Sequence, residues 1–452
     1  MAIAAVITML LLVAVVHWYL YRRLVRDVSK PGGAYRRIGA GVLVLMPVLA
    51  VLAVSGGEFG VPFGAQQVIG WPGFYWYAAL LYLTLTLLVS EIVRFAVLRR
   101  FRRAADRSAA RVPAPAPAPA PEREPEPAGA GGVPAAGARA AGAAPDAGPG
   151  GGGTGRPAAA GEGEGEGAEG AGEPERALPD RRLVLSRGIA VGAGVVTAGL
   201  LGYGTYAARD LTTKHVTVPL AKLPRAGHGY RIAVVSDIHL GPIAGRSHCR
   251  RVVDAVNATQ PDLIAVVGDL VDAEVDDLRT AAAPLRELRA RDGAYYVTGN
   301  HEYRVGPHAW VEHVAELGLR PLVNARDELA HFDLAGVNDA DGEGTEFGGP
   351  DYAAALGDRD TRRATVLMAH QPVQIHRAVD HGVDLQLSGH THGGQMWPAT
   401  YVAGLANPTL AGLERYGDTQ LYVTRGAGAW GPPVRIGADP DITVVRLASG
   451  QA

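Results

Sequence analysis

The sequence predicts an α/β domain preceded by an α-helical membrane domain. Apolar runs of nearly twenty residues recur near the N-terminus, and from Tyr230 onward short apolar runs alternate with longer mixed segments. Helices need about 20 apolar residues to cross a bilayer, and strands that alternate with helices are typical of α/β domains. We therefore expect four parts: a three-helix transmembrane domain (1–103), a linker (104–180), a fourth apolar segment (181–208) and the α/β domain (209–452).

Composition excludes several classes of protein. The chain has 452 residues, a formal net charge of −2 and a single cysteine, Cys249. The balanced charge gives no indication of a nucleic-acid partner. One cysteine excludes an intramolecular disulfide framework and any zinc or iron–sulfur site built from several cysteines.

The first three apolar runs cover residues 2–21, 38–54 and 74–98. The first run is also compatible with a secretory signal, but no basic residue precedes it and several follow it. Basic residues lie between the first and second runs and after the third, whereas none lies between residues 54 and 74. The positive-inside rule therefore places both basic segments in the cytoplasm. We expect an aromatic anchor at the outer interface, formed by Trp71, Tyr75, Trp76 and Tyr77.

Glu91 and Arg94 are the charged residues within the third run. They lie one helical turn apart near its inner end. We expect them to pair with each other there and not to form an intramembrane site.

Residues 104–180 are of low complexity, with Pro-Ala and Gly-Glu alternations. Such a composition cannot bury a core and predicts a disordered or semi-extended linker. The run 188–208 follows Arg181, Arg182 and Arg187, so it fits either a fourth transmembrane helix or an internal signal anchor of the twin-arginine type. Both alternatives predict a multi-pass protein of the cell membrane, with everything after Arg209 outside the cytoplasm.

The C-terminal pattern predicts eight strands, at residues 231–236, 263–267, 294–298, 329–336, 365–369, 385–388, 421–424 and 442–447. Helices are expected between them, for example at 247–258, 277–291 and 307–317. Five of these strands end in polar clusters that contain Asp237 and His239; Asp269 and Asp272; Asn300, His301 and Glu302; His370; and His390 and His392.

Ligands bind beyond the carboxyl ends of strands in open α/β sheets, so we expect the five clusters to meet at one edge. Each cluster alone is a weak signal, but five in order are hard to explain by chance. Imidazole, carboxylate and carboxamide groups without thiolate suit two divalent ions such as Mn, Fe or Zn. Glycines precede Asp269, Asn300 and His390, and we expect them to let these ligands approach closely.

This arrangement resembles the calcineurin-like metallophosphoesterase superfamily, whose signature is D-x-H, G-D-x-x-D, G-N-H-[DE], H and G-H-x-H. The motif at 389–395, with those at 422–426 and 430–435, is similar to the membrane-associated bacterial branch that includes YkuE and YaeI. The resemblance covers about residues 212–448 and implies a two-sheet β-sandwich flanked by helices.

The resemblance also implies residue roles. One metal would be held by Asp237, His239 and His392, and the other by Asn300, His370 and His390, with Asp269 bridging both. Two ions about 3.5–4 Å apart lower the pKa of a bridging water, which attacks as hydroxide, and clamp the phosphate oxygens. His301 is implied as general acid or transition-state stabiliser, with an orienting role as the alternative. Asp272 and Glu302 fit the motifs without an expected metal contact.

We therefore expect hydrolysis of a phosphomonoester or phosphodiester, with a substrate linked to lipid or the cell envelope as one hypothesis. Two alternatives stay open: a pyrophosphatase of a nucleotide-linked acylated sugar, and a membrane sensor that binds metal or nucleotide without turnover. Arg425 and Arg435 are expected in structural ion pairs. Residues 396–413 are poor in charge; we expect them to pack against the sheet, with contact to the bilayer as the alternative.

Overall fold

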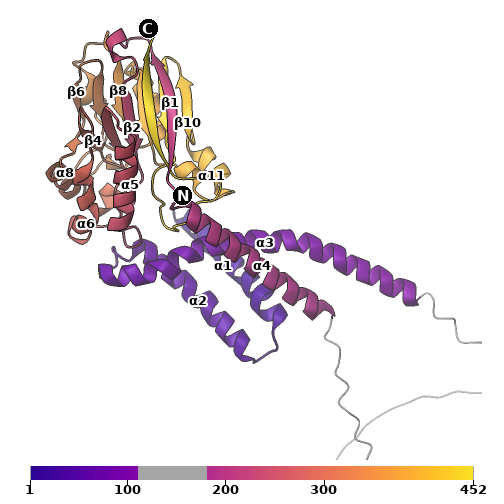
Figure 1. The fold of residues 1–452 in the computed structure, drawn as a ribbon. Helices are drawn as coiled ribbons and strands as arrows, with labels where there is room; N and C mark the ends of the chain where they lie inside the picture. Colours follow the sequence, from indigo (N-terminus) through magenta and orange to yellow (C-terminus); the bar gives the residue numbers. More distant parts are fainter. Residues whose placement is uncertain (1, 110–180, 451–452) are drawn as a thin grey trace, which may run out of the picture. The chain divides into compact units, whose positions relative to one another are not determined.

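A computed structural model describes residues 2–109 and 181–450 of the chain (Figure 1). Its N-terminal part and the segment before the α/β domain are helical over each predicted apolar run. The four helices are α1 (Ala2–Leu20), α2 (Ala34–Ser55), α3 (Phe63–Ala109) and α4 (Arg181–Ala207). Each contains a span long and apolar enough to cross a membrane. Most of the predicted linker, from residue 110 to 180, lies outside the described residues.

Glu91 and Arg94 of α3 pair with charged residues in the turn after α1. The expectation that they pair with each other is therefore wrong. This turn contains a π-helix, η1 (Tyr21–Val25), and a 3₁₀ turn, η2 (Arg26–Val28). The Nε atom of Arg23 lies 2.6 Å from Oε1 of Glu91, and Arg94 Nη1 lies 4.0 Å from Oδ2 of Asp27. Opposite charges on a neighbouring segment thus take the place of a pair within one helix.

The C-terminal part contains two six-stranded sheets. The first has the order β1-β12-β2-β3-β4-β5 and the second the order β10-β11-β9-β8-β7-β6. Their strands are β1 (Thr212–Leu220), β2 (Arg231–Val235), β3 (Leu263–Val267), β4 (Ala294–Val297), β5 (Arg320–Pro321), β6 (Ala325–Glu328), β7 (Asp333–Gly336), β8 (Thr365–Met368), β9 (Leu385–Ser388), β10 (Gly412–Tyr416), β11 (Thr419–Val423) and β12 (Asp441–Ser449).

Helices flank both sheets, which confirms the expected two-sheet sandwich. The α-helices of this part are α5 (Arg246–Ala258), α6 (Val275–Ala282), α7 (Glu302–Val305), α8 (Pro307–Glu316), α9 (Tyr352–Leu356), α10 (Ile375–Asp380) and α11 (Ala399–Ala406). Helices α5, α6 and α8 pack on the outer face of the first sheet, and α9 and α10 on that of the second.

The core between the sheets follows from the period of two along each strand. Ile232 and Val234 of β2 point toward the second sheet, where they meet side chains such as Val366 and Leu387. Their neighbours Ala233 and Val235 point the other way, toward α5. Strands buried on both faces read as nearly continuous apolar runs, which is why β2, β3, β4 and β8 lie close to where the sequence predicts them. In β9 two leucines alternate with the buried polar residues Gln386 and Ser388.

Strand β1 is absent from the prediction because its pattern is different. It pairs in parallel with β12 at the edge of the first sheet, and every second residue from Thr213 to Pro219 is exposed to solvent. Lys214 and His215 therefore lie in a strand that has no continuous apolar run. An edge strand needs little apolar surface, so periodicity alone gives a weak signal there.

Candidate metal centre

The polar clusters lie beyond the carboxyl ends of β2, β3, β4, β8 and β9, where the two sheets meet at one edge. Strands β2, β3 and β4 run parallel in the first sheet, and β8 and β9 run parallel in the second. Their carboxyl ends therefore point the same way within each sheet, and the distances below show that the five clusters converge. This confirms the expected meeting of clusters that are up to about 150 residues apart in the chain.

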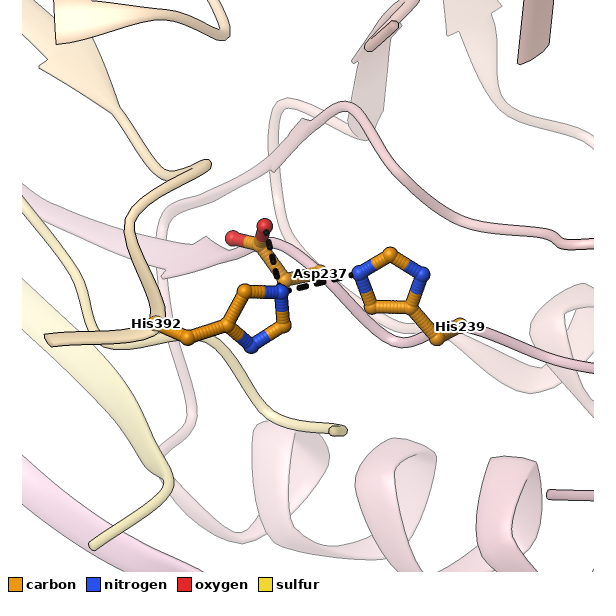
Figure 2. Close-up of side chains that lie close together, drawn as sticks. All are labelled: Asp237, His239 and His392. Atoms are coloured by element: carbon orange, nitrogen blue, oxygen red, sulfur yellow. Dashed lines mark hydrogen bonds and ion pairs between the residues drawn. The ribbon is translucent and has the colours of Figure 1, made fainter. Parts of the chain in front are cut away.

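The first group of side chains joins the loop after β2 to the loop after β9 (Figure 2). The Nε2 atoms of His239 and His392 lie 3.0 Å apart, and Nε2 of His392 lies 3.5 Å from Oδ1 of Asp237. All three residues are buried. Two imidazole nitrogens and a carboxylate oxygen are thus directed at one small volume.

The second group contains Asp269, His370 and His390, whose ligand atoms lie within 4.8 Å of one another. The Nδ1 atom of His390 is 2.9 Å from Oδ1 of Asn300, so the carboxamide joins this group. Asp269 lies between the two groups, because its Oδ2 is 3.2 Å from Nε2 of His370 and 3.8 Å from Nε2 of His239. All seven side chains expected to bind metal are therefore brought together.

Five of these seven residues have a left-handed backbone. The φ angles are 53° for Asp237, 50° for His239, 50° for Asp269, 72° for His390 and 52° for His392. Such a conformation costs roughly 1–3 kcal/mol for a residue with a side chain, and it clusters at functional sites. The strained turns are held by the surrounding strands and aim the side chains inward.

All three glycines that precede predicted ligands have no room for a side chain. A Cβ atom on Gly389 would overlap the side chains of Ser236 and Asp237, one on Gly299 would overlap Asp269, and one on Gly268 would overlap Gly299 and His370. The expectation that these glycines permit close approach of the ligand loops is confirmed.

Asp272 orients two histidines at once. Its Oδ1 lies 2.8 Å from Nδ1 of His239 and 2.7 Å from Nδ1 of His301, which leaves both Nε2 atoms facing the site. Although burial alone would raise it, the charges of the two rings hold the pKa of Asp272 well below its usual range. Burial by itself would lower the pKa of His239, but the carboxylates of Asp272, Asp269 and Asp237 together outweigh burial and raise that pKa to about 9.

Glu302 binds the backbone of two ligand loops. Its carboxylate accepts hydrogen bonds from the backbone N–H groups of Gly299 at 2.6 Å, Leu270 at 2.7 Å, Asp269 at 3.1 Å and Val271 at 3.3 Å. Burial raises the pKa of Glu302 to about 8, and the charge of Asp269 adds to the rise. These four hydrogen bonds all come from the backbone, so Glu302 fixes the loops through their main chain.

Arg435 has a role that the sequence did not predict. Its side chain is fully buried and donates to the carbonyl oxygens of His392 at 2.7 Å and Arg425 at 2.9 Å, and its Nη2 lies 3.0 Å from Nδ1 of His392. Within the described part of the chain it forms no ion pair, so the expected ion pair is wrong. Backbone carbonyl oxygens converge on the Arg435 guanidinium and accept the hydrogen bonds that a carboxylate would accept in an ion pair.

Asp339 is a second residue that the analysis of the sequence missed. It is buried just after β7, and its Oδ1 accepts a hydrogen bond from Nε2 of Gln371 at 2.8 Å. Gln371 directly follows the predicted ligand His370 in the chain. Burial raises the pKa of Asp339 to about 6. The available signal was its position, since the Asn338-Asp339 pair follows the end of a predicted strand after one intervening residue, much as the other polar clusters follow theirs.

The residues present fit divalent cations. Burial lowers the pKa of His390 to about 4 and that of His392 well below its usual range, so both imidazoles are neutral and offer lone pairs at pH 7. The buried Nε2 of His370 lies 3.2 Å from the carboxylate of Asp269 and makes no well-aligned hydrogen bond among the described residues. The carboxylates that raise the pKa of His239 stabilise any positive charge at this position. A metal ion bound there would therefore displace the proton from the His239 ring.

Comparison with known proteins agrees with the class that the sequence motifs resemble, the metallophosphoesterases. The calcineurin-like phosphoesterase family matches residues 230–394. A "Transmembrane protein with metallophosphoesterase domain" from Danio rerio is 38% identical over 267 residues, which are 56% of this chain and 61% of the relative. An uncharacterized metallophosphoesterase of Helicobacter pylori (strain J99) is 35% identical over 60% of this chain and 73% of its own length. The uncharacterized metallophosphoesterase YkuE of Bacillus subtilis is 32% identical over 58% of this chain and 94% of its own.

The chain therefore belongs to the calcineurin-like phosphoesterase family, which confirms the resemblance. Membership implies divalent metal ions and a phosphate-ester substrate. The match spans 61% and 63% of the length of the transmembrane relatives from Danio rerio and Bos taurus. Together with the four apolar helices, these relatives indicate association with a membrane.

Proposed function

We propose that this chain is a membrane-anchored phosphoesterase that uses two divalent metal ions and acts outside the cytoplasm. The observation that carries the proposal is the position of Asp269 between two groups of ligand atoms. One group is Asp237, His239 and His392, and the other is Asn300, His370 and His390. When bound, two such ions supply Lewis acidity toward phosphate oxygens and lower the pKa of water.

His301 is proposed to donate a proton to the leaving oxygen. Its Nδ1 lies 2.7 Å from Asp272, and its Nε2 lies 3.9 Å from Oδ2 of Asp269, at the wall of a cavity that reaches solvent. A ring fixed through Nδ1 presents Nε2 to a group bound at the metal site, as general acid catalysis requires. Trp430 packs edge-on against this ring, at 5.7 Å between centroids, and limits its rotation.

We expect His301→Asn to lower kcat by about 10²–10⁴-fold while the metal content stays unchanged. The loss should be small for p-nitrophenyl esters, whose leaving group needs little protonation, and large for alkyl esters. Steady-state kinetics and elemental analysis of the purified protein measure both quantities. The exposed His215 serves as the control through His215→Asn. An equal loss for both leaving groups would contradict proton donation and favour an orienting role.

The sidedness of the domain is proposed from the distribution of charge. Basic residues follow α1 and lie at the end of α3 and at the start of α4, whereas the turn between α2 and α3 has none. Four crossings with these basic ends inside leave the chain after α4 outside.

Fusion of alkaline phosphatase after Ala452 should give an active reporter in intact cells. Fusion of green fluorescent protein at the same site should stay dark when α4 is a plain membrane helix, whereas export of the folded domain by a twin-arginine route would leave it fluorescent outside the cytoplasm. Alkaline phosphatase folds only after export, so the pair reports which side the C-terminus occupies. Fusions within the basic turn between α1 and α2 provide the opposite control. A dark phosphatase fusion with a bright fluorescent one would overturn the proposed topology.

A lipid- or envelope-linked substrate is the finer proposal. A cavity of about 880 Å³ is lined by His239, Asp272 and His301 and also by apolar residues of α3 that include Phe63 and Phe74. A cavity that combines polar groups with an apolar wall suits an ester with a phosphate and an apolar substituent.

The decisive experiment measures hydrolysis by the full-length protein in lipid nanodiscs loaded with Mn²⁺. Bis-p-nitrophenyl phosphate, p-nitrophenyl phosphate, a phospholipid and a nucleotide-linked acylated sugar separate the diester, monoester, lipid and pyrophosphate alternatives. We expect turnover that falls to background with a chelator and returns when Mn²⁺ is added. Binding of two ions without hydrolysis of any of these substrates would favour the sensor.

A further inference from the structure

The helix α11 exposes an apolar stripe. Tyr401, Val402 and Leu405 lie on neighbouring positions of one face of α11, and Trp397 lies just before the helix. Their exposed fractions are 52%, 71%, 90% and 69% in the order Trp397, Tyr401, Leu405 and Val402. No residue of α11 is buried, and no charged residue occurs from 396 to 413.

The expectation that this segment packs against the sheet is therefore wrong for α11. Only the residues after it, such as Thr409, return to the domain and become buried. A stripe of large apolar side chains that the domain itself leaves uncovered marks a surface for another apolar phase or partner.

The start of α11 is joined to two of the long apolar helices. The hydroxyl of Tyr82 in α3 donates to the carbonyl oxygen of Trp397 at 2.9 Å. The N–H of Trp397 donates to the carbonyl oxygen of Ile436 at 2.8 Å, and the N–H of the adjacent Arg435 donates to Gly204 of α4 at 2.9 Å. These contacts place α11 where the apolar helices α3 and α4 reach the domain.

We propose that α11 lies in the interfacial region of the bilayer that α1–α4 cross, with Tyr401, Val402 and Leu405 among the acyl chains. Tryptophan and tyrosine favour this region because one end of the ring is apolar and the other is wet. A short apolar helix without charge and continuous with spanning helices binds such an interface through buried apolar area. This inference goes beyond the proposed function and holds whether or not the chain hydrolyses a phosphate ester.

The position of α11 has a consequence for the metal centre. The helix follows the turn η7 (His392–Gly394) after a few residues, and Gln395 between them donates to the carbonyl oxygens of Trp430 and Pro432 at 2.9 and 3.0 Å. A bilayer contact at α11 therefore holds the loop that carries His390 and His392 at a fixed height above the lipid.

The test uses full-length protein in nanodiscs, with a bimane fluorophore on a single introduced cysteine. The native Cys249 is fully buried and stays unlabelled. Leu405→Cys reports on α11, Val195→Cys on the exposed side of α4 within the bilayer, and Val323→Cys on an exposed surface of the α/β domain. Nitroxide lipids quench a fluorophore among acyl chains, and aqueous iodide quenches one in water.

We expect nitroxide lipids to quench the label at Leu405 nearly as strongly as that at Val195, and at least about threefold more than that at Val323. Iodide should show the reverse order. Quenching at Leu405 by iodide alone, as at Val323, would overturn the proposal. Quenching by neither reagent would also overturn it, because a second copy or another protein would then cover the stripe.

Discussion

Asp269→Asn should lower kcat/KM for every hydrolysed phosphate ester by at least about 10³-fold, which corresponds to about 4 kcal/mol of transition-state stabilisation. The carboxylate lies between the two ligand groups, 3.2 Å from Nε2 of His370 and 3.8 Å from Nε2 of His239. In the proposed two-metal site its negative charge would offset the repulsion between the cations, and an amide of the same shape would not. Metal content should fall as well, from two ions toward one.

The isosteric change separates chemistry from folding. An asparagine Oδ1 is able to keep the hydrogen bond from the N–H of His301, which the wild-type carboxylate accepts at 2.9 Å. The melting temperature should therefore change little when both proteins are compared without metal. Asp254→Asn on the exposed side of α5 is the matched control and should retain full activity. Normal turnover by Asp269→Asn with two bound ions would refute the bridging role.

Glu302→Ala should reduce the free energy of unfolding by about 3–5 kcal/mol, since it leaves several buried donors without an acceptor. The lost carboxylate accepts from four backbone N–H groups in the loops after β3 and β4. Those loops carry Asp269 and Asn300, so metal affinity should fall even where the protein remains folded. Denaturant titration and metal binding by calorimetry measure the two effects.

Glu302→Gln gives an intermediate test. It keeps one acceptor oxygen but turns an amide donor toward backbone donors, so part of the stability should return. Glu312→Ala in α8 is the matched control, because that carboxylate is exposed and should change stability by less than about 0.5 kcal/mol. A change in Glu302→Ala as small as in the control would show that water replaces the carboxylate.

Much of the centre could be predicted because its residues follow buried strands. Strands such as β3 read as uninterrupted apolar runs, and the polar residues that end them, such as Asp269, are conspicuous. Carboxyl ends of parallel strands share an edge, so topology alone brings such residues together. The same reasoning could not predict the position of Arg435, because its partners are backbone carbonyl oxygens. Every residue has such a carbonyl group, and no sequence pattern marks the ones that converge.

The sequence by itself determined the apolar helices, the buried strands and the identity of the side chains that meet at their ends. These depend on local periodicity and on the chemistry of each residue type. Only the tertiary structure decided which partner each charged group takes, such as Asp272 for His301 and Arg23 for Glu91. It also decided that α11 leaves its apolar stripe uncovered, because burial depends on what packs against a helix and not on the helix's own pattern.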